Sequence, residues 1–195
     1  MAMDYAFYSG KSNVGFNMKV NEDYILFDEH SFGDNLFCCI ADGAGSKEDN
    51  FRPSAIASNQ VQKVLARLYK KNPELFIDNV RLFMEESFFS ANDVLIGFKL
   101  GDESSRLNYA SSMTSAFLQR NGILTFAHAG NTRLYIIRNE KVKQLTQDHT
   151  EGQKLVDSGQ ISEENYYTAI ERLSLYNGIG ITPLPIIQTG ALRLK

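Results

Sequence analysis

The 195-residue sequence lacks the features that mark several large classes of protein. No apolar stretch approaches the roughly 18 residues of a membrane-spanning helix, and no basic segment followed by an apolar one marks a secretory signal. Lysine and arginine are scattered rather than clustered, and the formal net charge is -3. We therefore expect neither nucleic acid nor a membrane as a partner, and we expect a cytoplasmic protein.

Cysteine is also scarce. Cys38 and Cys39 are the only two, and they are adjacent in an apolar run. Successive side chains of a strand point to opposite faces, so these two cannot easily form a disulfide. There is no pair of CxxC or Cys/His motifs for zinc. Both cysteines are expected to be small core residues.

Glycine-rich phosphate loops are absent as well, because the sequence contains neither GxGxxG nor GxxxxGK[ST]. Nucleotide binding through such a loop therefore has no support. The residues that are present, 43% hydrophobic and 22% charged, are typical of a globular protein. We expect one domain spanning residues 1–195.

The order of apolar patterns predicts an α+β protein. Short apolar runs predict early strands, helical periodicity predicts two long helices, and a return to alternation after Ala110 predicts an antiparallel meander with turns such as Asn121-Gly122. Two short helices and a last strand follow. The predicted strands are 5–8, 24–27, 36–40, 112–118, 123–128, 132–138, 141–145 and 186–194, and the predicted helices are 53–72, 73–98, 151–158 and 162–167.

Carboxylates stand at the ends of two early strands. Glu22 and Asp23 precede one strand, and Asp42-Gly43 follows the next. If these strands are neighbours, three carboxylates converge at one sheet edge, where Mg²⁺ or Mn²⁺ would find the oxygen ligands it prefers. Two such ions can bridge a phosphate and activate water. The alternative is structural, since Asp-Gly is a common turn and Asn-Glu-Asp a common solvated loop.

The combination of these residues resembles the metal-dependent type 2C serine/threonine protein phosphatases, over essentially the whole sequence. Four further segments are similar to family motifs and occur in the family's order. They are Met113-Thr114-Ser115-Ala116 (Gly-Thr-Thr-Ala), Ala129-Gly130-Asn131-Thr132-Arg133 (Gly-Asp-Ser-Arg), Leu145-Thr146-Gln147-Asp148-His149-Thr150 (Leu-Thr-x-Asp-His-Ser) and Asn177-Gly178-Ile179-Gly180 (Ala-Leu-Gly).

The resemblance implies an αββα sandwich, in which two packed antiparallel sheets are flanked by helix pairs. It implies hydrolysis of phosphoserine and phosphothreonine in proteins by a metal-activated water, without a covalent phosphoenzyme. Asp42 would bridge two Mn²⁺ or Mg²⁺ ions, Gly43 would offer its carbonyl oxygen, and Glu22 would contact one metal through water. Asp23 would hydrogen-bond metal-bound water, which makes Asp42 and Asp23 the expected catalytic residues.

Three departures from the family pattern bear on this expectation. Met18 stands where the family has a phosphate-binding Arg, and Lys19 beside it is a weak substitute because it lacks the bidentate fork and points to the other face of a strand. Asn131 stands where an Asp can hold a further metal. The sequence also stops before two more metal-binding aspartates of the family, so we expect a domain incomplete at its C-terminus with a weakened metal site.

Two functions therefore stay open. One is a signalling hydrolase that acts on a phosphorylated protein, with a serine/threonine kinase as a partner. The other is a catalytically inactive, phosphatase-like module that binds a phosphoprotein or a kinase. The remaining candidates, His128 and His149, are expected to be structural, since a lone histidine is more often hydrogen-bonded than catalytic.

Overall fold

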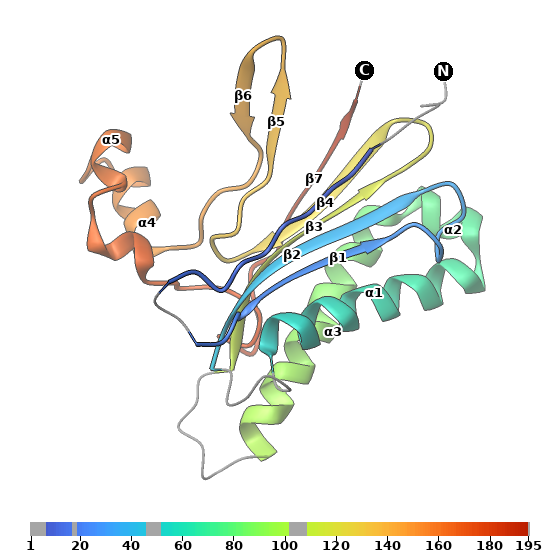
Figure 1. The fold of residues 1–195 in the computed structure, drawn as a ribbon, viewed down its shortest axis with the longest axis horizontal. Coiled ribbons are helices and arrows are strands. Elements are labelled where there is room, and N and C mark those ends of the chain that lie inside the picture. Colours follow the sequence, from blue (N-terminus) through green and yellow to red (C-terminus); the bar gives the residue numbers. More distant parts are fainter. Residues whose placement is uncertain (1–6, 17–18, 46–51, 102–108, 195) are drawn as a thin grey trace.

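A five-stranded antiparallel sheet organises the computed structural model, which describes residues 7–16, 19–45, 52–101 and 109–194 (Figure 1). Its strand order is β1-β2-β3-β4-β7. The strands are β1 (Asp23–Asp28), β2 (Leu36–Ala44), β3 (Ala110–Leu118), β4 (Ile123–Ala129) and β7 (Gln188–Arg193). The predictions of strands at 24–27, 36–40, 112–118, 123–128 and 186–194 are confirmed. The predicted strand at 5–8 is not, since Phe7 and Tyr8 belong to no strand and residues 5–6 lie outside the described residues.

Three helices pack against one face of this sheet: α1 (Pro53–Lys71), α2 (Pro73–Asp78) and α3 (Val80–Gly101) (Figure 1). Proline occupies the first turn of both α1 and α2, where its missing N–H costs nothing. The prediction of one continuous helix over 73–98 is wrong, because the helix breaks at Asn79. The Asn79 side chain donates to Leu75 O at 2.9 Å, so it competes with the helical backbone as asparagine often does.

Aromatic side chains fill the core between helices and sheet. Phe32, Phe76 and Phe117 are fully buried, and the ring of Phe117 lies 5.2 Å from that of Phe32 and 5.4 Å from that of Phe76. Cys39 is buried and Cys38 is half-buried, and neither is in a disulfide. The expectation of two unbridged cysteines is thus confirmed. β3 lies at the middle of the sheet and is buried on both faces, whereas β2 alternates between buried and more exposed positions.

A hairpin of β5 (Tyr135–Arg138) and β6 (Lys141–Gln144) forms a second, two-stranded sheet that projects from the first (Figure 1). Its turn residues Asn139 and Glu140 have φ of 49° and 60°, the left-handed values that a two-residue hairpin turn requires. The predicted meander of four consecutive strands is therefore wrong at its second pairing, because β4 pairs with β7 and not with β5. The α+β class with antiparallel sheets and helices is confirmed, although within the described residues the second sheet has only two strands.

Short helices follow the hairpin: α4 (Glu151–Asp157), α5 (Glu163–Tyr166) and a 3-10 turn, η1 (Ile170–Leu173). The hydroxyls of Thr150 and Ser162 cap α4 and α5 by accepting from backbone N–H groups at 3.1 and 3.3 Å. Both short helices were predicted, whereas η1 was not. Within the described ranges, no helix combines the length and the apolar character needed to cross a membrane.

Candidate metal and phosphate site

Asp23 and Asp42 are direct partners in the register of β1 and β2. The condition on which the candidate metal site depends, that these two strands are neighbours, is therefore met. The position of Asp42 differs from the prediction, because β2 continues through Asp42 and Gly43 instead of ending before them. A carboxylate within a ladder is held by backbone hydrogen bonds on both sides, so its direction is better fixed than that of a loop residue.

Gly43 closes tightly on the chain segment that carries Glu22. Its N–H donates to Glu22 O at 3.2 Å, and the hydroxyl of Ser54, a buried residue in the first turn of α1, donates to the same carbonyl oxygen. A Cβ atom at position 43 would lie 2.9 Å from Glu22 O and 3.1 Å from Ser54 Oγ. Only glycine fits this approach without displacement. Ser111 supports the other side by donating to Asp42 O at 3.1 Å.

The acidic groups affect one another. Partial burial raises the pKa of the Asp42 carboxyl, and the neighbouring charges of Asp23 and Glu22 raise it further. Asp23 and Asp42 also line a pocket of about 220 Å³, together with Lys11, Ser12 and Thr132 among others. A cation in this pocket would relieve the repulsion between the two carboxylates.

The ligand atoms at this site are of the type that a hard cation prefers, since they are carboxylate and carbonyl oxygens. They are few in number: within the described part of the chain, no group of three His, Cys, Asp or Glu side chains is arranged to hold a metal ion. The roles of Glu22, Asp23, Asp42 and Gly43 therefore stay predictions, supported by the paired carboxylates and the close approach of Gly43.

Lys11 is the positively charged residue among those that line this pocket, and the sequence did not indicate it. Lys19, the predicted weak phosphate ligand, is exposed and is not among the residues that line the pocket. Met18 lies outside the described residues. Lys11 belongs to none of the recognised motifs, so no sequence signal pointed to it.

The turn at residues 130–133 is anchored to β3. Ser112 Oγ accepts from the backbone N–H groups of Asn131 and Thr132, both at 2.7 Å. Gly130 has a φ of 110°, and any side chain there would collide with Ser112. Thr132 bonds the hydroxyl of Thr114 at 2.7 Å. This network sets the position of Thr132 in the wall of the 220 Å³ pocket.

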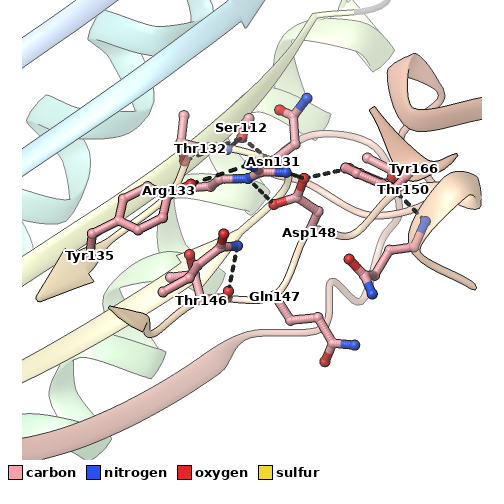
Figure 2. Close-up of polar contacts among 12 residues, drawn as sticks. Ser112, Asn131, Thr132, Arg133, Tyr135, Thr146, Gln147, Asp148, Thr150 and Tyr166 are labelled. Atoms are coloured by element: carbon pink, nitrogen blue, oxygen red, sulfur yellow. Dashed lines mark hydrogen bonds and ion pairs between the residues drawn. The ribbon is translucent and has the colours of Figure 1, made fainter. Parts of the chain in front are cut away.

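Next to this turn, Arg133 and Asp148 form a two-pronged ion pair (Figure 2). Arg133 Nε and Nη2 donate to the two Asp148 carboxylate oxygens at 2.8 and 2.6 Å, and the Tyr166 hydroxyl donates to Asp148 Oδ2 at 2.5 Å. The Asp148 side chain is 3% exposed, and its hydrogen bonds raise the pKa of Arg133. The pair ties the turn to the segment that leads into α4.

Both candidate histidines are held inside the protein. His128 is fully buried, bonding Thr114 Oγ1 at 2.9 Å and Gln147 O at 3.0 Å, and burial with the neighbouring His149 lowers its pKa to about 4. His149 Nδ1 accepts from Gly130 N–H at 3.1 Å and lies 2.7 Å from Asn177 Nδ2. Burial also lowers the pKa of His149. These bonds fit the expected structural role of both rings.

No family model matches the chain. Over 170 residues it is 25% identical to a curated protein of Streptococcus pyogenes, "Putative protein phosphatase 2C-type", and the match covers 87% of this chain and 66% of that protein. The "Serine/threonine phosphatase stp" of Listeria innocua is 22% identical over 143 residues, which cover 73% of this chain and 54% of that protein. The chain thus spans about half to two thirds of the length of these relatives.

Solved structures share the fold. The serine/threonine phosphatase Stp1 from Staphylococcus aureus superposes with a TM-score of 0.75 at 19% identity, covering 94% of this chain and 70% of that one. A PstP catalytic domain, described as a complex with 2 manganese ions, superposes with a TM-score of 0.67 at 22% identity, covering 94% of this chain and 71% of that one.

Proposed function

We propose that this chain, a relative of the type 2C serine/threonine phosphatases in sequence and fold, binds Mn²⁺ or Mg²⁺ through Glu22, Asp42 and Gly43 and hydrolyses phosphoserine and phosphothreonine in proteins. The observation that carries the proposal is the pairing of Asp42 with Asp23 across β1 and β2, beside a glycine that has no room for a side chain. Residues 1–195 would act as a single phosphatase-like domain.

Each residue has a distinct task in this proposal. The Asp42 carboxylate and the Gly43 carbonyl oxygen would hold the cation, Glu22 would contact it through water, and Asp23 would accept a hydrogen bond from the attacking water. The cation, when bound, supplies Lewis-acid chemistry and a reactive water. Lys11, in the same pocket, would attract the substrate phosphate as a point charge, without the bidentate grip of an arginine.

Metal-dependent hydrolysis of p-nitrophenyl phosphate tests this function. Manganese should stimulate turnover, and Asp42→Ala should abolish it because the main ligand is lost. Asp34→Ala is the control: Asp34 is exposed and pairs with the exposed Arg120 on the surface, so its removal should leave turnover unchanged. If the wild-type chain shows no manganese-dependent turnover with this substrate or with a phosphoserine peptide, the enzymatic proposal fails.

A second function has support from one observation. The described residues contain no three-ligand cluster for a metal, which supports the alternative of a catalytically inactive, phosphatase-like module. Such a module would bind a cytoplasmic phosphoprotein, or its serine/threonine kinase, through the face that carries Asp42. It predicts binding of a phosphoserine peptide without turnover, and equal binding in the presence of EDTA and of manganese.

A further inference from the structure

A pocket of about 300 Å³ lies on the other side of the 130–133 turn, between the base of the β5–β6 hairpin and helices α4 and α5. Arg133, Gln144, Gln147, Gln153, Glu163 and Tyr167 are among the residues that line it. Thr132 lines the pocket of Asp23 and Asp42, and Arg133, the next residue, lines this one. The two pockets therefore flank the same short stretch of backbone.

Three glutamines make the wall of this pocket rich in acceptors. Each uses its amide nitrogen in a hydrogen bond within the chain: Gln144 Nε2 donates to Thr146 O at 2.8 Å, and Gln147 and Gln153 Nε2 donate to the Asp157 carboxylate at 2.8 and 3.0 Å, the latter two at the surface. Within the described residues, none of the three Oε1 atoms accepts a hydrogen bond. These amide oxygens are therefore available to accept from N–H groups of a ligand.

The remaining walls also favour a cation. Glu163 contributes an exposed carboxylate, and Tyr167, whose residue surface is 63% exposed, contributes an aromatic ring that the Arg133 guanidinium already approaches on one face, at 5.8 Å from the ring centroid. Arg133 lines the pocket too, but its charge is already matched by the buried carboxylate of Asp148 in the ion pair of Figure 2. An anion would meet three amide oxygens and a carboxylate, which makes it the wrong ligand for this surface.

We infer that this pocket binds an arginine side chain of the phosphoprotein that the chain recognises. A guanidinium group offers five N–H donors in a plane and no acceptor, which matches glutamine oxygens and a carboxylate, and its flat face stacks on tyrosine. The inference rests on the proposed function for the nature of the partner. It adds a sequence preference: an arginine near the phosphorylated residue, in a chain that crosses the 130–133 turn.

The test measures binding of fluorescent phosphoserine peptides by anisotropy. One series carries a single arginine at successive positions on either side of the phosphoserine, and a matched series carries norleucine, which has a similar length and no charge. We expect at least one arginine position to bind about tenfold tighter than its norleucine counterpart, because a charged hydrogen bond and a stacked ring both contribute.

Variants locate the effect. Glu163→Gln and Tyr167→Leu should each reduce the advantage of arginine about fivefold without changing the affinity for the norleucine peptide. Glu164→Gln is the matched control, since Glu164 is the adjacent exposed carboxylate and does not line the pocket. The inference is overturned if arginine gives no advantage at any position, or if Glu164→Gln reduces the advantage as much as Glu163→Gln.

Failure of this site and failure of the proposed function give different results. Manganese-dependent hydrolysis of all peptides, with no preference for arginine, would overturn the arginine site and leave the phosphatase proposal intact. Arginine-dependent binding without metal-dependent hydrolysis would support the site and overturn the enzymatic proposal.

Discussion

Gly43 and Glu22 are joined by a backbone hydrogen bond of 3.2 Å, and the carbonyl oxygen of Glu22 leaves no room for a side chain at position 43. This contact sets the spacing between the two acidic segments of the candidate metal site. It is also the part of the site that can be tested without any metal.

Gly43→Ala should destabilise the protein by about 1–3 kcal/mol, because the new methyl group would push the Glu22 carbonyl oxygen and the Ser54 hydroxyl away from position 43. Urea denaturation followed by circular dichroism measures the change. Gly97→Ala is the control, since a Cβ at this helical position meets no atom within 4 Å. The control should be neutral or stabilising by up to about 1 kcal/mol. Equal effects of the two substitutions would contradict the close contact at Gly43.

Ser112→Ala should cost about 1–3 kcal/mol, because the N–H groups of Asn131 and Thr132 both lose their acceptor. Ser115→Ala, on the same strand, provides the comparison. Ser115 Oγ is buried and finds no hydrogen-bond partner in the part of the chain that the structure describes, so its removal should be neutral or stabilising. Thermal unfolding of the two variants side by side tests the anchor. A stable Ser112→Ala protein would show that the turn is held by other contacts.

Arg133→Met should cost about 3 kcal/mol, since the Asp148 carboxylate is left buried without its cation. Arg120→Met removes an ion pair whose side chains are 62% and 69% exposed, and it should cost less than about 1 kcal/mol. Chemical denaturation of both variants gives the comparison. The larger effect should persist at high salt, because a buried pair is poorly screened.

The pH dependence of stability should report His128. Its folded pKa of about 4 is below the ordinary value, so the unfolded chain takes up a proton that the native protein does not. The stabilisation by neutral His128 is therefore complete above about pH 6.5 and is lost as the pH falls towards 4, by about 3 kcal/mol. Denaturation midpoints between these pH values measure the slope.

His128→Gln should flatten this slope, although His149, whose pKa burial also lowers, will keep part of it. A wild-type slope that survives His128→Gln unchanged would assign the acid sensitivity to other groups.

The sequence predicted the features that depend on local pattern. Alternation and turn residues located the strands of the five-stranded sheet. The motifs around Asp42 and Asp148 indicated a resemblance to type 2C phosphatases, and a curated relative and solved structures of the same fold agree with it. The break at Asn79 was missed because its cause is one side chain bonding back to the preceding turn. The pairing of β4 with β7 was missed because alternation says which face is buried and not which strand is the neighbour.

The site was predictable only where motifs mark it. The register that sets Asp23 against Asp42 follows from two strands that are close in the sequence. Ser54 and Lys11 reach the same region from segments without a recognised motif, so only the three-dimensional structure brings them in. The glutamine wall was missed for another reason: Gln144 and Gln153 bond residues two and four positions away and Gln147 bonds one ten positions away, and no motif marks these three residues as neighbours in one pocket.

The pairing of β7 with β4 has a consequence for how the chain acquires its structure. β7 returns to β4 across the whole of β5, β6, α4 and α5, a separation along the chain similar to the one that α1, α2 and α3 place between β2 and β3. Closing so long a loop is slow, because its entropy is lost before the new contacts form. During synthesis, the β4 edge would therefore wait uncovered while the intervening segments emerge, and this is the stage at which the nascent chain most needs protection from other exposed strands.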